Sequence, residues 1–190
     1  METKNIMIVG VGGQGSLLAS KLLGVLLTDE GYDVKVSEVH GMSQRGGSVV
    51  TYVRFGDQVY SPVIAQGEAD YIVSFEKLEA GRHAPCLKKD GRIIVNSQQI
   101  DPMPVITGAA EYPENILEEL KEKGLQVDDI DALSLAAEAG NMKSVNIVLM
   151  GRLARYFDIP YEKWIKAIKK CVKPQFVQVN EKAFALGFNS

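Results

Sequence analysis

The chain has 190 residues, 46% hydrophobic and 24% charged, which is typical of a folded domain and excludes a disordered or collagen-like protein. Its length allows one domain to bury enough surface to fold without disulfides or a structural metal. The formal net charge of −3 counts against a general nucleic-acid binder, which is usually basic. Cys86 and Cys171 are too few for a four-cysteine zinc or iron–sulfur site, and they predict two buried thiols in a reducing compartment.

The first 39 residues predict a βαβ unit. An apolar run at 5–9 indicates a strand buried on both faces, and a glycine turn at 10–15 separates it from a helix at 16–28. Residues 33–39 alternate weakly and predict the next strand. The helix carries only one charge, Lys21, so we expect it to be fully buried or covered by a partner. Glycines interrupt the apolar stretch, which favours a cytoplasmic protein without a membrane span.

The middle of the chain predicts more strands and a helical C-terminal part. Residues 48–55 and 58–64 flank Gly56-Asp57, which is a hairpin signal, and Pro62 places the second arm at an edge. Two further buried strands are expected at 71–75 and 92–96. Helices are expected at 77–87, 113–124, 141–157, 161–172 and 176–186.

Together these elements predict one α/β domain over residues 1–190. Its expected architecture is a Rossmann-like layered fold with a mainly parallel sheet plus a hairpin, and with helices packed around the sheet. The helix at 161–172 and the residues after it carry a stripe of five lysines. A solvated helix face explains such a stripe, and a docking site for an acidic partner or a phosphorylated ligand is the alternative. The five are Lys163, Lys166, Lys169, Lys170 and Lys173.

The first glycine turn fits the pattern G-x-G-x-x-G between a strand and a helix. Gly10 permits the sharp turn, Gly12 lets a ligand approach the backbone, and Gly15 lets the helix pack close to the strand. Free N–H groups at the helix start attract an anion. Glu38, near the end of the next strand, stands where dinucleotide enzymes place a ribose-binding acid.

This pattern leaves a stand-alone NAD- or FAD-dependent oxidoreductase open as a function. Such an enzyme needs an acid or base, and His40 and His83 are the obvious candidates. A glycine turn used only for packing, in a non-catalytic scaffold or anion-binding module, is a second alternative. One observation counts against a dinucleotide-binding enzyme. A glycine-rich loop and a predicted hairpin follow Glu38, whereas a dinucleotide-binding fold usually continues with another helix there.

The second loop carries the most informative residues. It reads His40-Gly41-Met42-Ser43-Gln44-Arg45-Gly46-Gly47-Ser48. Its glycines allow tight turns that expose backbone N–H groups. Arg45 offers a planar fork for phosphate or carboxylate, and His40 at a strand end can act as acid, base or hydrogen-bond donor.

The two loops together resemble the gamma-type domain of the 2-oxoacid:ferredoxin oxidoreductases. The late segment with Gly140, Asn141, Asn146 and Gly151 is similar to that domain's G-N-x-x-x-x-N helix. The closing helix is similar in its Asn180, Lys182, Ala183 and Gly187. Within the family, the chain length and Met42–Arg45 look most like the small (beta) subunit of the indolepyruvate branch. A gamma subunit of a pyruvate or 2-oxoglutarate enzyme is the alternative within the family.

The resemblance implies oxidative decarboxylation of a 2-oxoacid, with capture of the acyl group by coenzyme A and reduction of ferredoxin. This chain has no GDG…N stretch for thiamine diphosphate and magnesium, because Gln58 follows Gly56-Asp57, and it has no run of cysteines. Thiamine diphosphate, Mg and 4Fe-4S clusters are therefore expected on a larger catalytic (alpha) subunit, and ferredoxin contacts the complex. No nucleic acid or membrane partner is expected.

The resemblance also implies which residues form the site. His40 and Arg45 are expected to support catalysis, and neither they nor the others are expected to hold a metal. The chain is expected to help bind coenzyme A or to complete the partner's active site. Ligand-binding positions are then expected at Gly10, Gly12, Gly13, Gln14, Gly15, Gly41, Ser43, Gln44, Arg45, Gly46, Gly47, Asn141 and Asn146.

Overall fold

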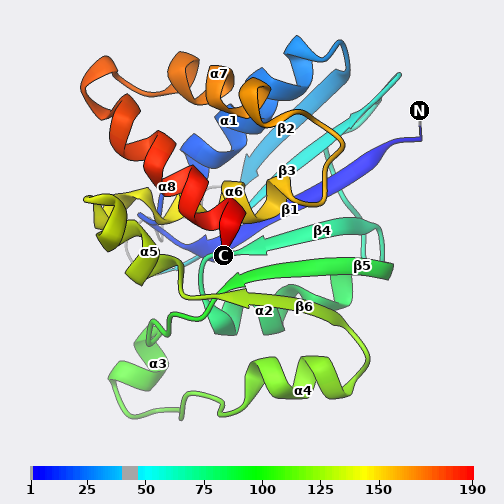
Figure 1. Ribbon diagram of the computed structural model, residues 1–190. Helices are drawn as coiled ribbons and strands as arrows, with labels where there is room; N and C mark the ends of the chain where they lie inside the picture. The colour runs from blue at the N-terminus through cyan, green and yellow to red at the C-terminus, as the bar shows by residue number, and fades with distance from the viewer. Residues whose placement is uncertain (1, 40–46) are drawn as a thin grey trace.

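A computed structural model describes residues 2–39 and 47–190, which fold around one six-stranded sheet (Figure 1). The strand order is β2-β3-β1-β4-β5-β6. β1, β4, β5 and β6 pair in parallel, whereas β3 runs antiparallel to its neighbours β1 and β2. The strands are β1 Lys4–Val11, β2 Asp33–Val39, β3 Ser48–Gly56, β4 Ala69–Ser74, β5 Leu87–Asn96 and β6 Gln126–Ile130.

Helices lie on both faces of the sheet (Figure 1). α1, α6, α7 and α8 lie on one face, and α2 and α4 lie on the other. The helices are α1 Ser16–Asp29, α2 Lys77–His83, α3 Met103–Ile106, α4 Ile116–Glu122, α5 Ala132–Ala139, α6 Val145–Ala154, α7 Tyr161–Cys171 and α8 Val177–Asn189. Short 3-10 helices occur at Ala84–Cys86, Met142–Ser144 and Pro174–Phe176. The predicted α/β fold with a mainly parallel sheet is confirmed.

Alternation along β1 explains why its sequence is apolar throughout. Ile6 and Ile8 point into the core under α1 and α6, while Met7 and Val9 point into the core under α2 and α4. All four are at most 1% exposed. A strand covered on both faces needs apolar side chains at every position, as the run at 5–9 predicted.

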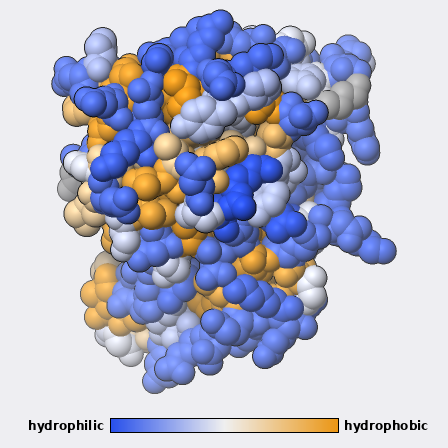
Figure 2. All heavy atoms as spheres, in the orientation of Figure 1, coloured by the Kyte–Doolittle hydropathy of each residue, from blue (hydrophilic) through white to orange (hydrophobic). Residues whose placement is uncertain are grey.

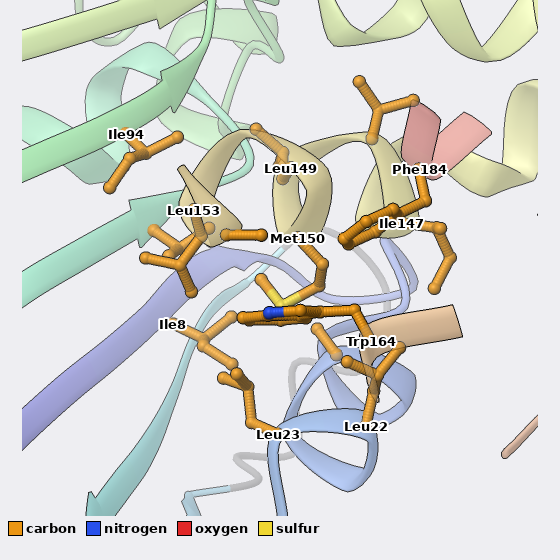
Figure 3. Close-up of a cluster of buried hydrophobic side chains, with 14 of the residues drawn as sticks. Ile8, Leu22, Leu23, Ile94, Ile147, Leu149, Met150, Leu153, Trp164 and Phe184 are labelled. Atoms are coloured by element: carbon orange, nitrogen blue, oxygen red, sulfur yellow. The ribbon is translucent and has the colours of Figure 1, made fainter. Parts of the chain in front are cut away.

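Trp164 of α7 lies at the centre of the larger core (Figure 3). Its indole lies beside Met150 of α6 and the α1 leucines Leu22 and Leu23. α1 packs against the sheet and against α7, so this chain itself covers most of the almost uncharged helix. Of the two alternatives expected for this helix, burial within the chain therefore accounts for most of it, although Leu17 in its first turn remains 52% exposed.

Two glycines allow α6 and α8 to cross in close contact. A Cβ at Gly187 would lie 2.0 Å from the carbonyl oxygen of Val148, and one at Gly151 would lie 2.2 Å from that of Phe184. Any side chain at either position would therefore collide with backbone. These late glycines of the family resemblance thus have a packing role.

The predicted hairpin between 48–55 and 58–64 is wrong. Residues 58–64 form no strand, and β3 pairs instead with β2 and with β1. The segment after β3 is held by Arg54, whose guanidinium donates to the carbonyls of Ser61 (3.1 Å) and Val63 (2.8 Å). A side chain satisfies these carbonyls, so no strand ladder forms. β1 and β2 run in the same direction, but β3 lies between them.

Several boundaries also differ from the sequence prediction. β6 and α5 were not predicted, and the helix expected over 113–124 is the shorter α4. The helix expected at 77–87 ends at His83, before Pro85, and residues 103–106, for which no helix was predicted, form α3. Both cysteines are half-buried rather than buried. In the ranges described, no helix is long and apolar enough to cross a membrane.

Candidate functional site

The candidate site lies at the carboxyl ends of β1 and β4. From β1 the chain runs through α1 to β2 on one side of the sheet, and from β4 it runs through α2 to β5 on the other. Such a point, where the chain leaves two neighbouring parallel strands in opposite directions, opens a crevice at the strand ends. The glycine turn at 10–15 lies on one side of that point, and the start of α2 lies on the other.

The Gln14 side chain closes the glycine turn. Its Oε1 accepts the N–H of Val11 at 2.7 Å, and its Nε2 donates to the carbonyl of Phe75 at 3.2 Å. Gly13 and Gly15 have φ angles of +95° and +89°, which L side chains rarely adopt. Gln14 therefore ties the end of β1 to the end of β4.

Asn146 of α6 supports the same turn from the helical C-terminal part. Its Nδ2 donates to the carbonyl of Gly15 at 3.1 Å, and its Oδ1 accepts the N–H of Ile147 at 2.9 Å. A Cβ at Gly15 would lie 2.6 Å from that Nδ2. The structure thus brings together Gly15 and Asn146, two predicted site residues 131 positions apart.

The second loop lies mostly outside the described residues. His40, Gly41, Ser43, Gln44, Arg45 and Gly46 fall in the gap, as does Met42. The residues that follow it lie beside the glycine turn. The carbonyl of Gly47 accepts the N–H of Gly12 at 3.0 Å, and the hydroxyl of Ser48 donates to the carboxylate of Glu79.

Two buried carboxylates that sequence reasoning missed, Glu76 and Glu79, line this crevice. Glu76 is 1% exposed and accepts the N–H groups of Glu79 (3.0 Å) and Ile100 (3.2 Å), together with the hydroxyl of Tyr112. Burial and the hydrogen bond to Glu76 raise the pKa of Tyr112. The signal that could have found Glu76 is its place directly after a buried strand.

Glu79 is 4% exposed and contacts three polar groups. Besides Ser48, Arg82 Nε lies 3.2 Å from its carboxylate, and His83 Nε2 lies at 3.7 Å, an ion-pair distance beyond hydrogen-bond reach. Burial acts to raise the pKa of Glu79, but His83, Ser48 and Arg82 outweigh it and leave the pKa lowered. Glu79 is therefore a carboxylate at neutral pH.

A pocket of about 360 Å³ opens between these groups. Ser48, Glu76, Glu79 and Arg82 form its polar wall. Its apolar wall includes Ile100, Pro102, Met103 and Pro104. Met103 and Ile106 of α3 are 61% and 66% exposed, and Figure 2 shows a hydrophobic area at lower left, where α3 lies in Figure 1. The crevice thus combines buried negative charge with an exposed apolar rim.

Two other predicted residues make contacts elsewhere. Asn141 caps the 3-10 helix at Met142–Ser144 by accepting the N–H of Lys143 at 3.0 Å. Glu38 accepts the hydroxyl of Ser20 at 2.8 Å on the edge strand β2. Because β3 separates β2 from β1, Glu38 is not on the strand beside the glycine turn. This geometry counts against the dinucleotide reading.

Three of the five lysines in the stripe form ion pairs with acidic side chains of the same chain. Lys163 pairs with Glu30 at 2.7 Å, Lys169 pairs with Glu181 at 3.0 Å, and Lys170 pairs with Asp29. These pairs join α7 to the end of α1 and to α8. For these three lysines the structure therefore supports a solvated, internally paired helix face. In the described parts of the chain, no group of three His, Cys, Asp or Glu is placed to hold a metal ion.

Comparison with known proteins places these features in context. Residues 5–190 match the family model described as pyruvate ferredoxin/flavodoxin oxidoreductase. The indolepyruvate oxidoreductase subunit IorB of Pyrococcus horikoshii is 47% identical over 194 residues, which cover 98% of this chain and 95% of that protein. The subunit of the same name from Archaeoglobus fulgidus is 39% identical, with 97% and 94% covered.

A solved structure has the same fold. The crystal structure of pyruvate oxidoreductase subunit PORC from Thermotoga maritima superposes with a TM-score of 0.75 and covers 100% of this chain and 97% of its own. The two sequences are 22% identical, so the likeness concerns the fold.

Proposed function

The chain belongs to the pyruvate ferredoxin/flavodoxin oxidoreductase family, and we propose that it is the small subunit of a ferredoxin-dependent oxidoreductase acting on indolepyruvate or a related arylpyruvate. The observation that carries this proposal is the near-full-length similarity to IorB subunits. We propose further that residues 1–190 form one gamma-type domain of that family.

In the proposed reaction, the 2-oxoacid loses its carboxylate as carbon dioxide, and the remaining acyl carbon gives up two electrons. One electron passes to each of two ferredoxins. The acyl group forms a thioester with the sulfur of coenzyme A, and the thiol proton is released.

A larger partner subunit carries the thiamine diphosphate, magnesium and 4Fe-4S clusters in this proposal. The residues of this chain do not fit those groups, since the described parts offer no cluster of metal-binding side chains. Cys86 lies in the 3-10 helix before β5 and Cys171 at the end of α7, so they belong to different parts of the fold. We therefore derive no electron-transfer step within this chain.

The chain's own contribution is to bind coenzyme A or to complete the partner's active site. The N–H groups of Val11 and Gly12 already donate hydrogen bonds within the turn region, so they are not available to a phosphate. The pocket beside the turn is lined by two buried carboxylates, which repel phosphate. The phosphates of coenzyme A are therefore expected outside that pocket, at Arg45 and the start of α1.

The variants Arg45→Ala and His40→Ala, made in the whole complex, distinguish the two roles. Coenzyme A binding predicts that Arg45→Ala raises the KM for coenzyme A roughly tenfold or more, whereas the structural role predicts loss of the complex at unchanged KM.

The proposal is tested by recovering the tagged chain from its native cells without oxygen. We expect a brown complex with one larger subunit, whose visible absorption bleaches when indolepyruvate and coenzyme A are added. Pyruvate and 2-oxoglutarate, added in parallel, test the substrate class. The same tagged chain produced alone is the control and should be colourless. A colourless protein recovered alone from native cells would contradict the proposal.

A further inference from the structure

We propose that a pocket at the amino ends of the parallel strands, at the opposite edge of the sheet from the glycine turn, binds a small phosphate-bearing anion. The pocket measures about 430 Å³. Its cationic side chains come from two strands, β1 and β5. They are Lys4, Lys88, Lys89 and Arg92, and the pocket's acidic side chains are Asp70 and Asp90. Four positive and two negative groups leave a net charge of +2, which matches a phosphate dianion.

Asp70 holds two of the lysines together. Its Oδ1 lies 3.3 Å from Lys4 Nζ and 3.5 Å from Lys88 Nζ, so the two ammonium groups lie within about 7 Å of each other. Its Oδ2 accepts the N–H of Asn5 at 2.9 Å, which fixes the carboxylate to β1. Each ammonium has three donors, so both keep donors for a ligand. One carboxylate does not balance two lysines.

The backbone of β5 bends at this point to place the lysines. The pairing of β4 with β5 shifts register between Ala69 and Tyr71, and Asp90 has a φ of 65°, which is left-handed. A Cβ at Gly91 would lie 2.9 Å from the carbonyl oxygens of Ala69 and Lys88, so the bend requires glycine there. Bulges of this kind redirect side chains at the edges of sheets and beside binding sites.

Arg92 is fixed in place before any ligand arrives. Its guanidinium lies 4.4 Å from the ring centroid of Tyr156, and its Nη2 donates to Gln126 on β6. Within the described ranges, no other hydrogen bond from its guanidinium occurs, which leaves Nε and Nη1 free to donate. A stacked arginine with free donors is suited to a planar fork on phosphate.

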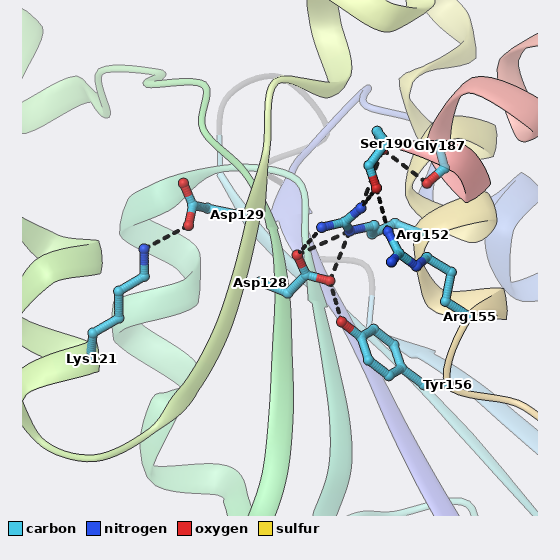
Figure 4. Close-up of polar contacts among 8 residues, drawn as sticks. All are labelled: Lys121, Asp128, Asp129, Arg152, Arg155, Tyr156, Gly187 and Ser190. Atoms are coloured by element: carbon cyan, nitrogen blue, oxygen red, sulfur yellow. Dashed lines mark hydrogen bonds and ion pairs between the residues drawn. The ribbon is translucent and has the colours of Figure 1, made fainter.

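A second ion pair holds the ring on which Arg92 lies (Figure 4). The hydroxyl of Tyr156 donates to Asp128 at 2.5 Å, and Arg152 binds both oxygens of the same carboxylate, at 2.7 and 2.8 Å. Asp128 and Arg152 are only 8% and 16% exposed in their side chains. The platform under Arg92 is thus rigid, and the cations converge on the pocket without a matching set of acids.

The full chain is titrated with inorganic phosphate by calorimetry, against sodium chloride at matched ionic strength. We expect saturable binding that Arg92→Gln weakens roughly tenfold or more, the loss typical of a charge-assisted contact. Lys89→Ala, an exposed residue whose loss leaves the fold intact, should weaken it several-fold. Lys173→Ala removes the same charge from the segment after α7, which does not line the pocket, and should change binding less than twofold. Glycerol 3-phosphate distinguishes the source, because tighter binding than inorganic phosphate indicates a phosphorylated metabolite and weaker binding indicates free phosphate.

The proposal is overturned if phosphate gives no more heat than chloride. It is equally overturned if Lys173→Ala weakens phosphate binding as much as Lys89→Ala. That result would mean that the overall electrostatic field of the protein, and not the pocket, attracts phosphate. Circular dichroism of each variant confirms that the fold is retained. The outcome is independent of the recovery experiment above, since it needs neither the partner subunit nor ferredoxin.

Discussion

The two ends of the sheet use polar side chains differently. At the carboxyl ends, the side chains of Gln14, Glu76, Asn96 and Asn146 bond mainly to backbone groups, and so they fix the course of the chain. At the amino ends, acidic, basic and aromatic side chains bond mainly to one another, as Asp70 does to its two lysines. Changes at the first end should therefore lower stability without altering ion binding, while changes at the second should also alter ion binding.

The largest expected effect is from Gly15→Ala at the carboxyl end. The left-handed φ and the collision with Asn146 should together lower the free energy of unfolding by about 2–4 kcal/mol. Urea unfolding measures this. Gly13→Ala is the matched control, because its φ is equally positive but no atom lies within 4 Å of the added Cβ. It should lose only about 1–2 kcal/mol. Equal losses in both variants would mean that the Asn146 contact is unimportant.

Asp128→Asn tests the other end of the sheet. It leaves Arg152 without its carboxylate and should lower the free energy of unfolding by about 2–3 kcal/mol, below the full cost of breaking a buried pair because Arg152 is partly exposed. Unlike Gly15→Ala, it should also weaken phosphate binding, because the Tyr156 platform loses its anchor. Calorimetry with both variants makes this comparison. Unchanged phosphate binding in Asp128→Asn together with weakened binding in Gly15→Ala would reverse the distinction between the two ends.

Glu79 should make stability depend on pH at the carboxyl end. Its folded pKa lies below its ordinary value of 4.5, so the unfolded chain binds its proton first as pH falls. The stabilisation is therefore complete above pH 4.5 and is lost as pH falls through the folded pKa, by about 1.4 kcal/mol for each unit between the two pKa values. Urea unfolding at several pH values should show a shallower loss in Glu79→Gln. The exposed Glu118→Gln should follow the parent chain, and an identical pH profile for Glu79→Gln would contradict this role.

The smallest effect is expected from the lysine stripe. Lys163→Ala removes an exposed pair with Glu30 and should change the free energy of unfolding by less than about 1 kcal/mol. It should not change phosphate affinity. Added salt should reduce even this small difference. A loss above 2 kcal/mol would show that surface pairs contribute more here than the polar groups at either sheet end suggest.

Sequence patterns correctly predicted the parts of the fold whose conformation depends on the residues of a single short segment. The apolar run at 5–9, the glycine turn and α1 are of this kind, because periodicity and glycine positions are local properties. The partner of β3 was missed because Gly56-Asp57 is a sound turn signal, whereas strand pairing depends on distant segments. β6 was missed because Asp128 makes it polar, and its charge is balanced by Arg152 on α6.

The candidate site was predictable only in part for the same reason. The spacing of glycines located the turn, but nothing in the spacing shows that Asn146 meets Gly15 from 131 positions away. Asn146 entered the prediction through family resemblance alone. Glu76 and Glu79 were missed because buried carboxylates resemble surface ones in sequence. The position of Glu76 after a buried strand was a signal for it alone, and the hydrogen bonds from Ile100, Tyr112 and Ser48 show that both are buried in the fold.

The carbonyl of Phe75 accepts two side-chain amides, from Gln14 and from Asn96, at 3.2 Å each. The Gln14 side chain also accepts a hydrogen bond from the N–H of Val11, and the Asn96 side chain accepts one from the N–H of Ala132 at 3.1 Å. These two backbone protons, one at the end of β1 and one at the start of α5, are thus shielded from solvent by a row of carboxamides. In deuterated water they should exchange through opening of that row, so replacement of Gln14 would shorten the lifetime of the Ala132 proton, and replacement of Asn96 would shorten that of the Val11 proton.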